Sequence, residues 1–220
     1  MLEVNMAAAR RQMVDQQVRG WGVIDTEVVA VMSELARERY APERYRNLAY
    51  ADSPIPIGHG EVMLLPSVQG RIMQAVQVAA GERVLEIGTG TGYLTACLAA
   101  LGGRVRSVDI HEEFVAAAGE QLAADGFGRV ELACADAHTL EAEGPEWHVI
   151  VVTGSLPERD PSFPRRLAEG GRLLWIVGEA PAMRVEVVTR TGSEEWRTTG
   201  LFETVVPALV GTSALRRFEF

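Results

Sequence analysis

From Arg83 onward, short apolar runs alternate with longer amphipathic stretches. Each apolar run is nearly free of polar residues, which is typical of a parallel-sheet strand that is buried on both faces. The strands are predicted at 83–87, 104–108, 129–133, 147–153 and 171–177, and the helices near 92–102, 112–125 and 161–168. This alternation predicts an α/β fold in which helices cover a doubly wound, mostly parallel sheet.

The last part of the chain follows a different pattern, because apolar and polar residues alternate one by one. Two such runs, at 184–189 and 201–206, are separated by the polar turn Thr191-Gly192-Ser193. Strict alternation is typical of strands with one buried and one exposed face. The pattern therefore predicts an antiparallel edge to the sheet.

The first 80 residues are predicted to be mainly helical. Apolar residues at helical spacing indicate helix over about 6–40, with Asp25 as an N-cap. Several prolines predict an irregular segment over 41–62. A further helix is predicted over 67–79, because Pro66 is well placed to open it.

One predicted strand and the turn after it carry the strongest chemical signal. The run VLEIGTGTGY, from Val84 to Tyr93, reads as a buried strand, a glycine-rich turn and the start of a helix. The alternating glycines let a backbone approach a ligand where a side chain would collide. The helix N-terminal amides that follow favour a carboxylate or phosphate. Asp109 ends the next strand, where an acid can accept hydrogen bonds from ribose hydroxyls. The unit is therefore predicted to bind a nucleoside.

The details of this unit favour S-adenosylmethionine over a dinucleotide. The spacing is Gly-x-Gly-x-Gly, and Glu86 stands two residues before the first glycine. A carboxylate there would repel a pyrophosphate but suits a ligand that carries an ammonium and a sulfonium. Asp136 ends the next strand-like run and is placed to accept from the adenine amino group, although a lone acid there is more often a cap or turn residue. The candidate cofactor-binding residues are Glu86, Gly88, Thr89, Gly90, Gly92, Asp109, Ile110, Asp136, Ala137 and Thr153.

Composition narrows the class of protein without identifying it. The chain has 220 residues, is 47% hydrophobic and carries a formal net charge of −9, which argues against a nucleic-acid partner. Cys97 and Cys134 are expected to be buried thiols in a reducing cytosol. No segment reads as a membrane span or secretory signal, and no metal-ligand spacing is present. A cytoplasmic protein without a metal or a membrane partner is expected, and its oligomeric state is left open.

Beyond the glycine turn, the chain resembles the protein-L-isoaspartate O-methyltransferases over nearly its whole length. The most specific match is LAYADSPIPIGHG at 48–60, whose irregular proline and glycine pattern is hard to reach by chance. The other matches are RVLEIGTGTGY at 83–93, IVVTGSLPE at 150–158, LAEGGRL at 167–173 and VPALVG at 206–211. The resemblance implies a seven-stranded, Rossmann-like sheet in a single domain over 1–220, with a helical substrate-cleft segment at 1–80 and the cofactor-binding sheet at 81–220. It also implies methyl transfer from S-adenosylmethionine to an isoaspartyl carboxylate in protein or peptide.

The sequence departs from this family directly after the most specific match. The family pattern continues Gln-Thr-Ile-Ser-Gln-Pro, whereas this chain has Glu61-Val62-Met63-Leu64-Leu65-Pro66. Leu64 takes the position of the family's serine, which lies between the methyl donor and the accepting carboxylate. By the resemblance, Met63 and Leu64 face the methionine end of the cofactor and the acceptor; the alternative is that they only fill the core. His59 is the candidate base of this segment, although a histidine between two glycines is more often a structural hydrogen-bonding residue.

These acceptor-site candidates leave three functional hypotheses. A carboxylate is already ionised at neutral pH and needs no general base, so a site without an obvious catalytic residue is compatible with isoaspartyl methylation. The aliphatic stretch at 62–65 supports instead a methyltransferase with a less polar small-molecule acceptor. The third hypothesis is a protein that binds the cofactor without isoaspartyl activity.

Overall fold

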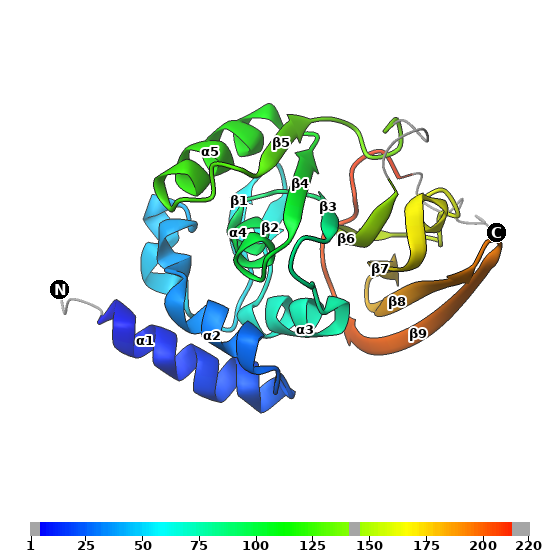
Figure 1. Cartoon of the computed structure of the whole chain (residues 1–220). Helices are drawn as coiled ribbons and strands as arrows, with labels where there is room; N and C mark the ends of the chain where they lie inside the picture. The colour runs from blue at the N-terminus through cyan, green and yellow to red at the C-terminus, as the bar shows by residue number, and fades with distance from the viewer. Residues whose placement is uncertain (1–4, 141–145, 213–220) are drawn as a thin grey trace, which may run out of the picture.

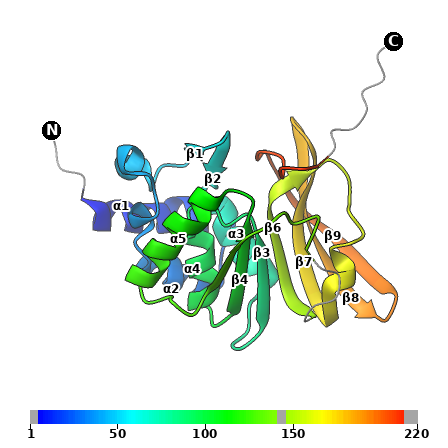
Figure 2. The same cartoon turned by 90° about the horizontal axis from the view of Figure 1, so that it is seen from above.

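The computed structural model describes residues 5–140 and 146–212. Within these ranges the main sheet has the strand order β5-β4-β3-β6-β7-β8-β9 (Figures 1 and 2). Strands β3 to β7 run parallel to one another, whereas β8 pairs antiparallel with both β7 and β9. The bounds are β3 Arg83–Ile87, β4 Arg104–Asp109, β5 Glu131–Cys134, β6 Trp147–Leu156, β7 Leu167–Glu179, β8 Ala182–Gly192 and β9 Glu195–Thr204. The predicted fold class, a mostly parallel seven-stranded sheet, is confirmed.

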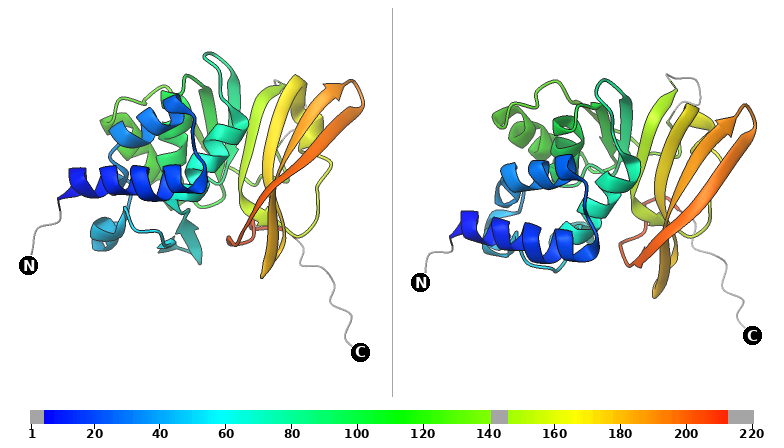
Figure 3. Two further views of the ribbon diagram at one scale, coloured as in Figure 1. Left: turned by 90° about the horizontal axis from the view of Figure 1, so that it is seen from below. Right: turned by 60° about the horizontal axis from the view of Figure 1, so that its bottom comes forward.

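The antiparallel edge is also confirmed, and both of its strands are longer than the sequence pattern indicated. The β8–β9 hairpin forms the end of the sheet that lies farthest from the N-terminal helices (Figure 3). Gly192 pairs with Glu195, so the reversal lies at Ser193 and Glu194, just beyond the Thr191-Gly192 dipeptide of the predicted turn. Most of β9 is exposed or half-buried, as expected for an edge strand.

The sequence pattern predicted helices on both faces of the sheet, but the α-helices of the described residues pack against one face, where they bury the larger part of the core. Apolar residues of α3, α4 and α5 form one cluster with strand residues such as Val84, Val149 and Leu174, all of which are fully buried. Helix α2 and the π-helical segment that continues α1 lie against α3, away from the antiparallel strands (Figure 1). The bounds are α1 Met6–Gln12, α2 Thr26–Glu34, α3 Pro66–Val76, α4 Tyr93–Ala100 and α5 Glu112–Ala124. This packing fixes the position of β3 and β4, whose ends carry the candidate site.

The helix predicted at 161–168 is wrong. The structure has a single 3-10 turn at Pro164–Arg166, and Leu167 already belongs to β7. Pro164 lacks a backbone N–H and its ring collides with the carbonyl four residues earlier, so a helix that begins at Pro161 cannot continue through it. Phe163 is nevertheless fully buried in the second apolar cluster, which covers the other face of the sheet around Ile150.

The continuous helical pattern predicted over 6–40 is broken into several short elements. After α1 the chain forms a π-helical segment at Met13–Val18 and a 3-10 turn at Arg19–Trp21, which ends at Gly22 with a φ of 83°. Asp25 is the N-cap of α2 as predicted, because its side chain accepts from the amides of Glu27 and Val28. The left-handed glycine redirects the chain, so the two helices can pack on different surfaces.

The segment predicted to be irregular, 41–62, contains a short hairpin. Strands β1 (Ile55–Gly58) and β2 (Glu61–Met63) pair antiparallel. His59 and Gly60 form the turn, and both have positive φ, 52° and 83°, as a type I′ turn requires. The proline and glycine pattern therefore encodes a tight reversal that places Val62, Met63 and Leu64 beside the glycine turn.

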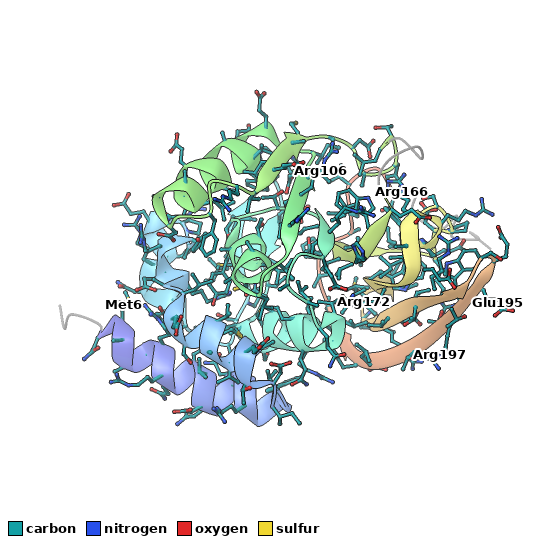
Figure 4. The ribbon with its side chains drawn as sticks, in the orientation of Figure 1. Met6, Arg106, Arg166, Arg172, Glu195 and Arg197 are labelled. Atoms are coloured by element: carbon teal, nitrogen blue, oxygen red, sulfur yellow. The ribbon has the colours of Figure 1, made fainter. Side chains whose placement is uncertain are left out.

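Helix α3 ends earlier than predicted, at Val76 rather than near residue 79. Gln77 adopts a left-handed conformation with a φ of 44°. The Arg172 guanidinium donates to the carbonyls of Val76 and Gln77 and forms an ion pair with Glu82 (Figure 4). A distant arginine thus satisfies carbonyls that the helix leaves without partners, and local sequence carries no signal for this contact.

The two cysteines differ in their environments. Cys97 is fully buried in α4, as expected. Cys134 is exposed, because it stands at the end of β5, the strand at the edge of the sheet. The prediction of two buried thiols is therefore wrong for Cys134. Within the described ranges no helix is long and apolar enough to cross a membrane.

Candidate active site

A cleft opens at the carboxyl ends of the parallel strands, where ligands bind in open α/β sheets. One wall comes from the ends of β3, β4, β5 and β6 and from the glycine turn. The opposite wall comes from β1, β2 and the start of α3. The C-terminal segment 207–210 closes one side, since Ser155 exchanges backbone hydrogen bonds with Pro207 and Leu209.

The glycine turn is held from the neighbouring strand. Gly88 has a φ of 94°, and a Cβ on it would lie 2.1 Å from Oγ1 of Thr153. That hydroxyl donates to the carbonyls of Ile87 and Gly88, at 3.0 Å each. Thr153 therefore fixes the turn through its side chain while it lines the cleft. A glycine is required here by both the backbone conformation and the lack of space.

Asp109 links the end of β4 to the glycine turn. Its carboxylate accepts from the amide of Gly90 at 2.9 Å and from the amide of His111 at 3.0 Å, one bond to each oxygen. Since a carboxylate oxygen can accept two hydrogen bonds, both oxygens keep acceptor capacity toward the cleft. Asp109 is thus held rigidly in a position to accept from ligand hydroxyls.

Glu86 is fully buried at the floor of the cleft. Its Oε2 accepts from Thr95 Oγ1 at 2.5 Å and from Ser107 Oγ at 2.7 Å, whereas its Oε1 has no partner among the described residues. Burial raises the pKa of Glu86 to about 7, against the two hydroxyl hydrogen bonds that lower it. A buried carboxylate with an unpartnered oxygen suits a cationic ligand group, so this wall fits the ammonium-bearing cofactor predicted from the sequence.

Asp136 and Ala137 lie at the far end of the same cleft, with Ile110 beside them. Asp136 caps its own turn, because its Oδ1 accepts from the amide of His138 at 2.9 Å. Ala137 is buried, and Ile110 is exposed to 38%. The three strand ends at 87–90, 109–110 and 136–137 therefore converge as the sequence predicted.

Two of the predicted site residues lie outside the cleft wall. Gly92 is the N-cap of α4, and a Cβ on it would lie 3.0 Å from Cβ of Ala118, so its role is close helix packing. His59 lies beyond the wall, with its ring stacked on that of His111 at 4.0 Å between ring centroids and its Nε2 3.7 Å from the Glu113 carboxylate.

His59, His111 and Glu113 form a cluster that the sequence spacing did not indicate. One ligand-type atom from each lies within 4.8 Å of the others. The two imidazole planes are only 17° apart. The lone pairs of the rings lie in nearly parallel planes and do not converge on a common point, so the observed side-chain conformations do not form a metal site.

The acceptor candidates Met63 and Leu64 line the wall opposite Glu86, and both are buried. Val62 extends this aliphatic surface. Glu61, at the start of β2, also lines the cleft, and burial together with the charge of Asp109 raises its pKa. The sequence prediction missed other lining residues, namely Ile57, Gln69, Thr91, Leu94, His111 and Phe114. Gln69 in particular reads as an ordinary helix residue, and only the packing of α3 brings it to the cleft.

The sheet order and the nucleoside-type cleft define an S-adenosylmethionine-dependent methyltransferase. A family model described as protein-L-isoaspartate(D-aspartate) O-methyltransferase (PCMT) matches residues 8–212. The chain belongs to this family, as the sequence resemblance predicted.

Individual relatives agree with this assignment. Protein-L-isoaspartate O-methyltransferase 1 of Rhodopseudomonas palustris is 38% identical over 208 residues, which cover 94% of this chain and 85% of that protein. The enzyme of Koribacter versatilis is 34% identical, over 87% and 86% of the two chains. The crystal structure of a Plasmodium falciparum protein, described as a PCMT in complex with S-adenosyl-L-homocysteine, has a TM-score of 0.81 at 21% identity and covers 94% of this chain and 99% of that one. This last likeness shows the shared fold.

Proposed function

We propose that this protein transfers a methyl group from S-adenosylmethionine to the carboxylate of an isoaspartyl residue in protein or peptide. The observation that carries the proposal is the make-up of the acceptor wall. Val62, Met63 and Leu64 present only apolar side chains there, which suits an acceptor that is already ionised and needs no base beside it. A carboxylate meets this requirement at neutral pH, whereas a hydroxyl does not.

The chain's own residues would bind and orient the reactants. Glu86 would accept from the cofactor's ammonium and Asp109 from its ribose hydroxyls. At Gly88 and Gly90 the protein backbone can approach the cofactor closely, because no side chain intervenes. The aliphatic wall would exclude water from the line between donor and acceptor. S-adenosylmethionine supplies the methyl group: the new bond forms to a carboxylate oxygen, the bond to sulfur breaks with its electron pair left on the neutral thioether, and no proton is transferred.

The same proposal includes the setting of the activity. Residues 1–80 would form part of the substrate cleft and 81–220 would hold the cofactor, as parts of one domain in a cytoplasmic enzyme. Met13 and Val18, from the N-terminal part, are buried in the same apolar cluster as residues of the sheet. This shared core supports the proposal that both parts belong to one domain.

A second acceptor class is favoured by Leu64. A cleft that hydrogen-bonds its substrate loses discrimination when the hydrogen-bonding groups are replaced by aliphatic ones. Val62, Leu64 and Leu65 stand at three polar positions of the family pattern. This favours a less polar small-molecule acceptor, or cofactor binding without isoaspartyl activity.

One experiment separates these hypotheses. Labelled methyl transfer from S-adenosylmethionine is measured with an isoaspartyl peptide and with the same peptide carrying normal aspartate. We expect base-labile labelling of the isoaspartyl peptide alone. Protein that binds S-adenosylhomocysteine by calorimetry but labels neither peptide would contradict the proposal, and labelling of other acceptors in a cell extract would then support the second class.

A further inference from the structure

Arg37 is a fully buried cation behind the acceptor wall. Its Nε donates to the carbonyl of Ala49 at 2.7 Å and its Nη2 to the carbonyl of Leu64 at 2.6 Å. Its Nη1 donates to Oε1 of Gln69, and its guanidinium lies over the ring of Tyr93, 5.0 Å from the centroid. All three acceptors are neutral oxygens, and no described carboxylate forms an ion pair with it.

The contact with Arg37 fixes the orientation of the Gln69 amide. A guanidinium can only donate hydrogen bonds, so the amide oxygen has to face Arg37. The Nε2 donors of Gln69 then point the other way. Gln69 lies in the wall of the cleft together with Leu64, and no described atom accepts from its Nε2. The amide therefore presents donors where the acceptor group would sit.

We propose that Gln69 Nε2 donates a hydrogen bond to the accepting carboxylate, in place of the serine hydroxyl that the family pattern has where this chain has Leu64, and that Arg37 positions Gln69. This inference rests on the proposed function, because it assumes a carboxylate acceptor. Gln69 would be a specificity-determining residue in contact with substrate, and Arg37 would act through it and through the backbone of Leu64.

The charge distribution supports the same assignment. Burial lowers the pKa of Arg37 to about 10, which leaves the guanidinium charged at neutral pH. A buried cation without an anionic partner stabilises a nearby anion more strongly than a solvated one does. The amide of Gln69 lies between this cation and the cleft, so its donors are polarised toward an anionic ligand.

The test compares variants of Gln69 in full-length protein. Gln69→Leu removes the donor, and Gln69→Glu keeps an acceptor for Arg37 but replaces the donor with an oxygen. Both are expected to lower kcat/KM for the isoaspartyl peptide by about 10- to 100-fold, since a hydrogen bond to a charged group is removed. The affinity for S-adenosylhomocysteine, measured by calorimetry, should stay within about twofold. Gln12→Leu, the same substitution at an exposed position of α1, is the matched control and should change neither quantity.

Two further variants separate a substrate contact from a structural role. Adding Leu64→Ser to Gln69→Leu supplies a new donor and should restore kcat/KM several-fold, which repair of packing alone would not do. Arg37→Lys keeps the charge but loses the planar fork, and it should raise KM for the peptide several-fold without changing the S-adenosylhomocysteine affinity.

Each outcome bears on a different claim. Wild-type labelling with both Gln69 variants within twofold of wild type would overturn the role of Gln69 and leave the proposed function standing. A wild-type protein that binds S-adenosylhomocysteine but does not label the isoaspartyl peptide would overturn the proposed function and, with it, this inference. If Gln69→Leu does not fold, Gln69→Glu decides the matter, because it keeps the hydrogen bond to Arg37.

Discussion

The two walls of the cleft differ in polarity: one carries a hydrogen-bonded network of polar side chains, and the other is mainly aliphatic. On the cofactor wall the polar groups belong to a dense network, in which Asp109 accepts two backbone amides and Glu86 accepts two hydroxyls. On the acceptor wall the side chains at 62–64 are aliphatic, and Gln69 supplies the amide. The comparison teaches that the residues proposed to bind the cofactor follow a strand-by-strand sequence pattern, whereas those proposed to bind the acceptor come together from segments with no common pattern.

The walls also differ in charge. Glu86 and Asp109 line the cofactor side. On the acceptor side Glu61 stands at the start of β2, and buried Arg37 stands behind the wall. The two acids suit a cationic donor, and the buried guanidinium suits an anionic acceptor. The buried Arg37 thus agrees with the proposed carboxylate acceptor, although the family pattern's hydrogen-bonding side chains at 62, 64 and 65 are aliphatic here.

The largest effect is expected from a substitution in the glycine turn of the cofactor wall. In Gly88→Ala the new Cβ would lie 2.1 Å from Thr153 Oγ1 at a φ of 94°, so either the turn or Thr153 has to move. We expect the dissociation constant for S-adenosylhomocysteine to rise by about 100-fold or more, as the turn and the strand end lose their register. Gly128→Ala, where a Cβ meets nothing within 4 Å, should bind as wild type does. Unchanged binding by Gly88→Ala would show that the turn does not hold the cofactor.

A smaller effect, on kcat/KM, is expected from a substitution in the acceptor wall. Leu64→Ser adds a hydroxyl beside Gln69 without touching the cofactor wall. We expect kcat/KM for the isoaspartyl peptide to rise by about two- to tenfold, the range of one net hydrogen bond, while S-adenosylhomocysteine affinity stays constant. Steady-state kinetics with the isoaspartyl and aspartyl peptides measure the effect. A loss of activity would indicate that the aliphatic wall serves a different acceptor.

A further prediction concerns stability and pH at Glu86, whose pKa burial raises from 4.5 to about 7. Between these values the folded protein keeps a proton that the unfolded chain has released, so the contribution of Glu86 to stability falls as pH rises from about 4.5 to 7 and is level above. The difference in Tm between wild type and Glu86→Gln should shift in favour of the variant across this range. A constant difference from pH 4.5 to 8 would contradict the raised pKa.

Much of the fold followed from local patterns. The parallel strands are encoded by apolar runs that only a doubly covered sheet can bury, and the edge by strict alternation. Where the sequence-based predictions were wrong, the cause was either a proline inside a predicted helix or a contact between residues far apart in the sequence. Pro164 stops the helix predicted at 161–168, and the position of β5 at the sheet edge exposes Cys134. Helix α3 ends early at the left-handed Gln77, where the distant Arg172 accommodates the free carbonyls.

The sequence by itself determined the cofactor wall, because the acids and the glycine turn belong to consecutive strand ends that a parallel sheet necessarily brings to one edge. It also predicted, through the family resemblance, that Leu64 faces the acceptor. Only the tertiary structure decided what stands beside Leu64. Arg37 and Gln69 are 32 residues apart and carry no mutual spacing signal. Their contact exists because the fold buries both side chains side by side, one from the 3-10 turn at Arg37–Arg39 and one from α3. A buried cation needs hydrogen-bond acceptors, and here the Gln69 amide oxygen serves as one. The amide nitrogen is thereby directed toward the cleft.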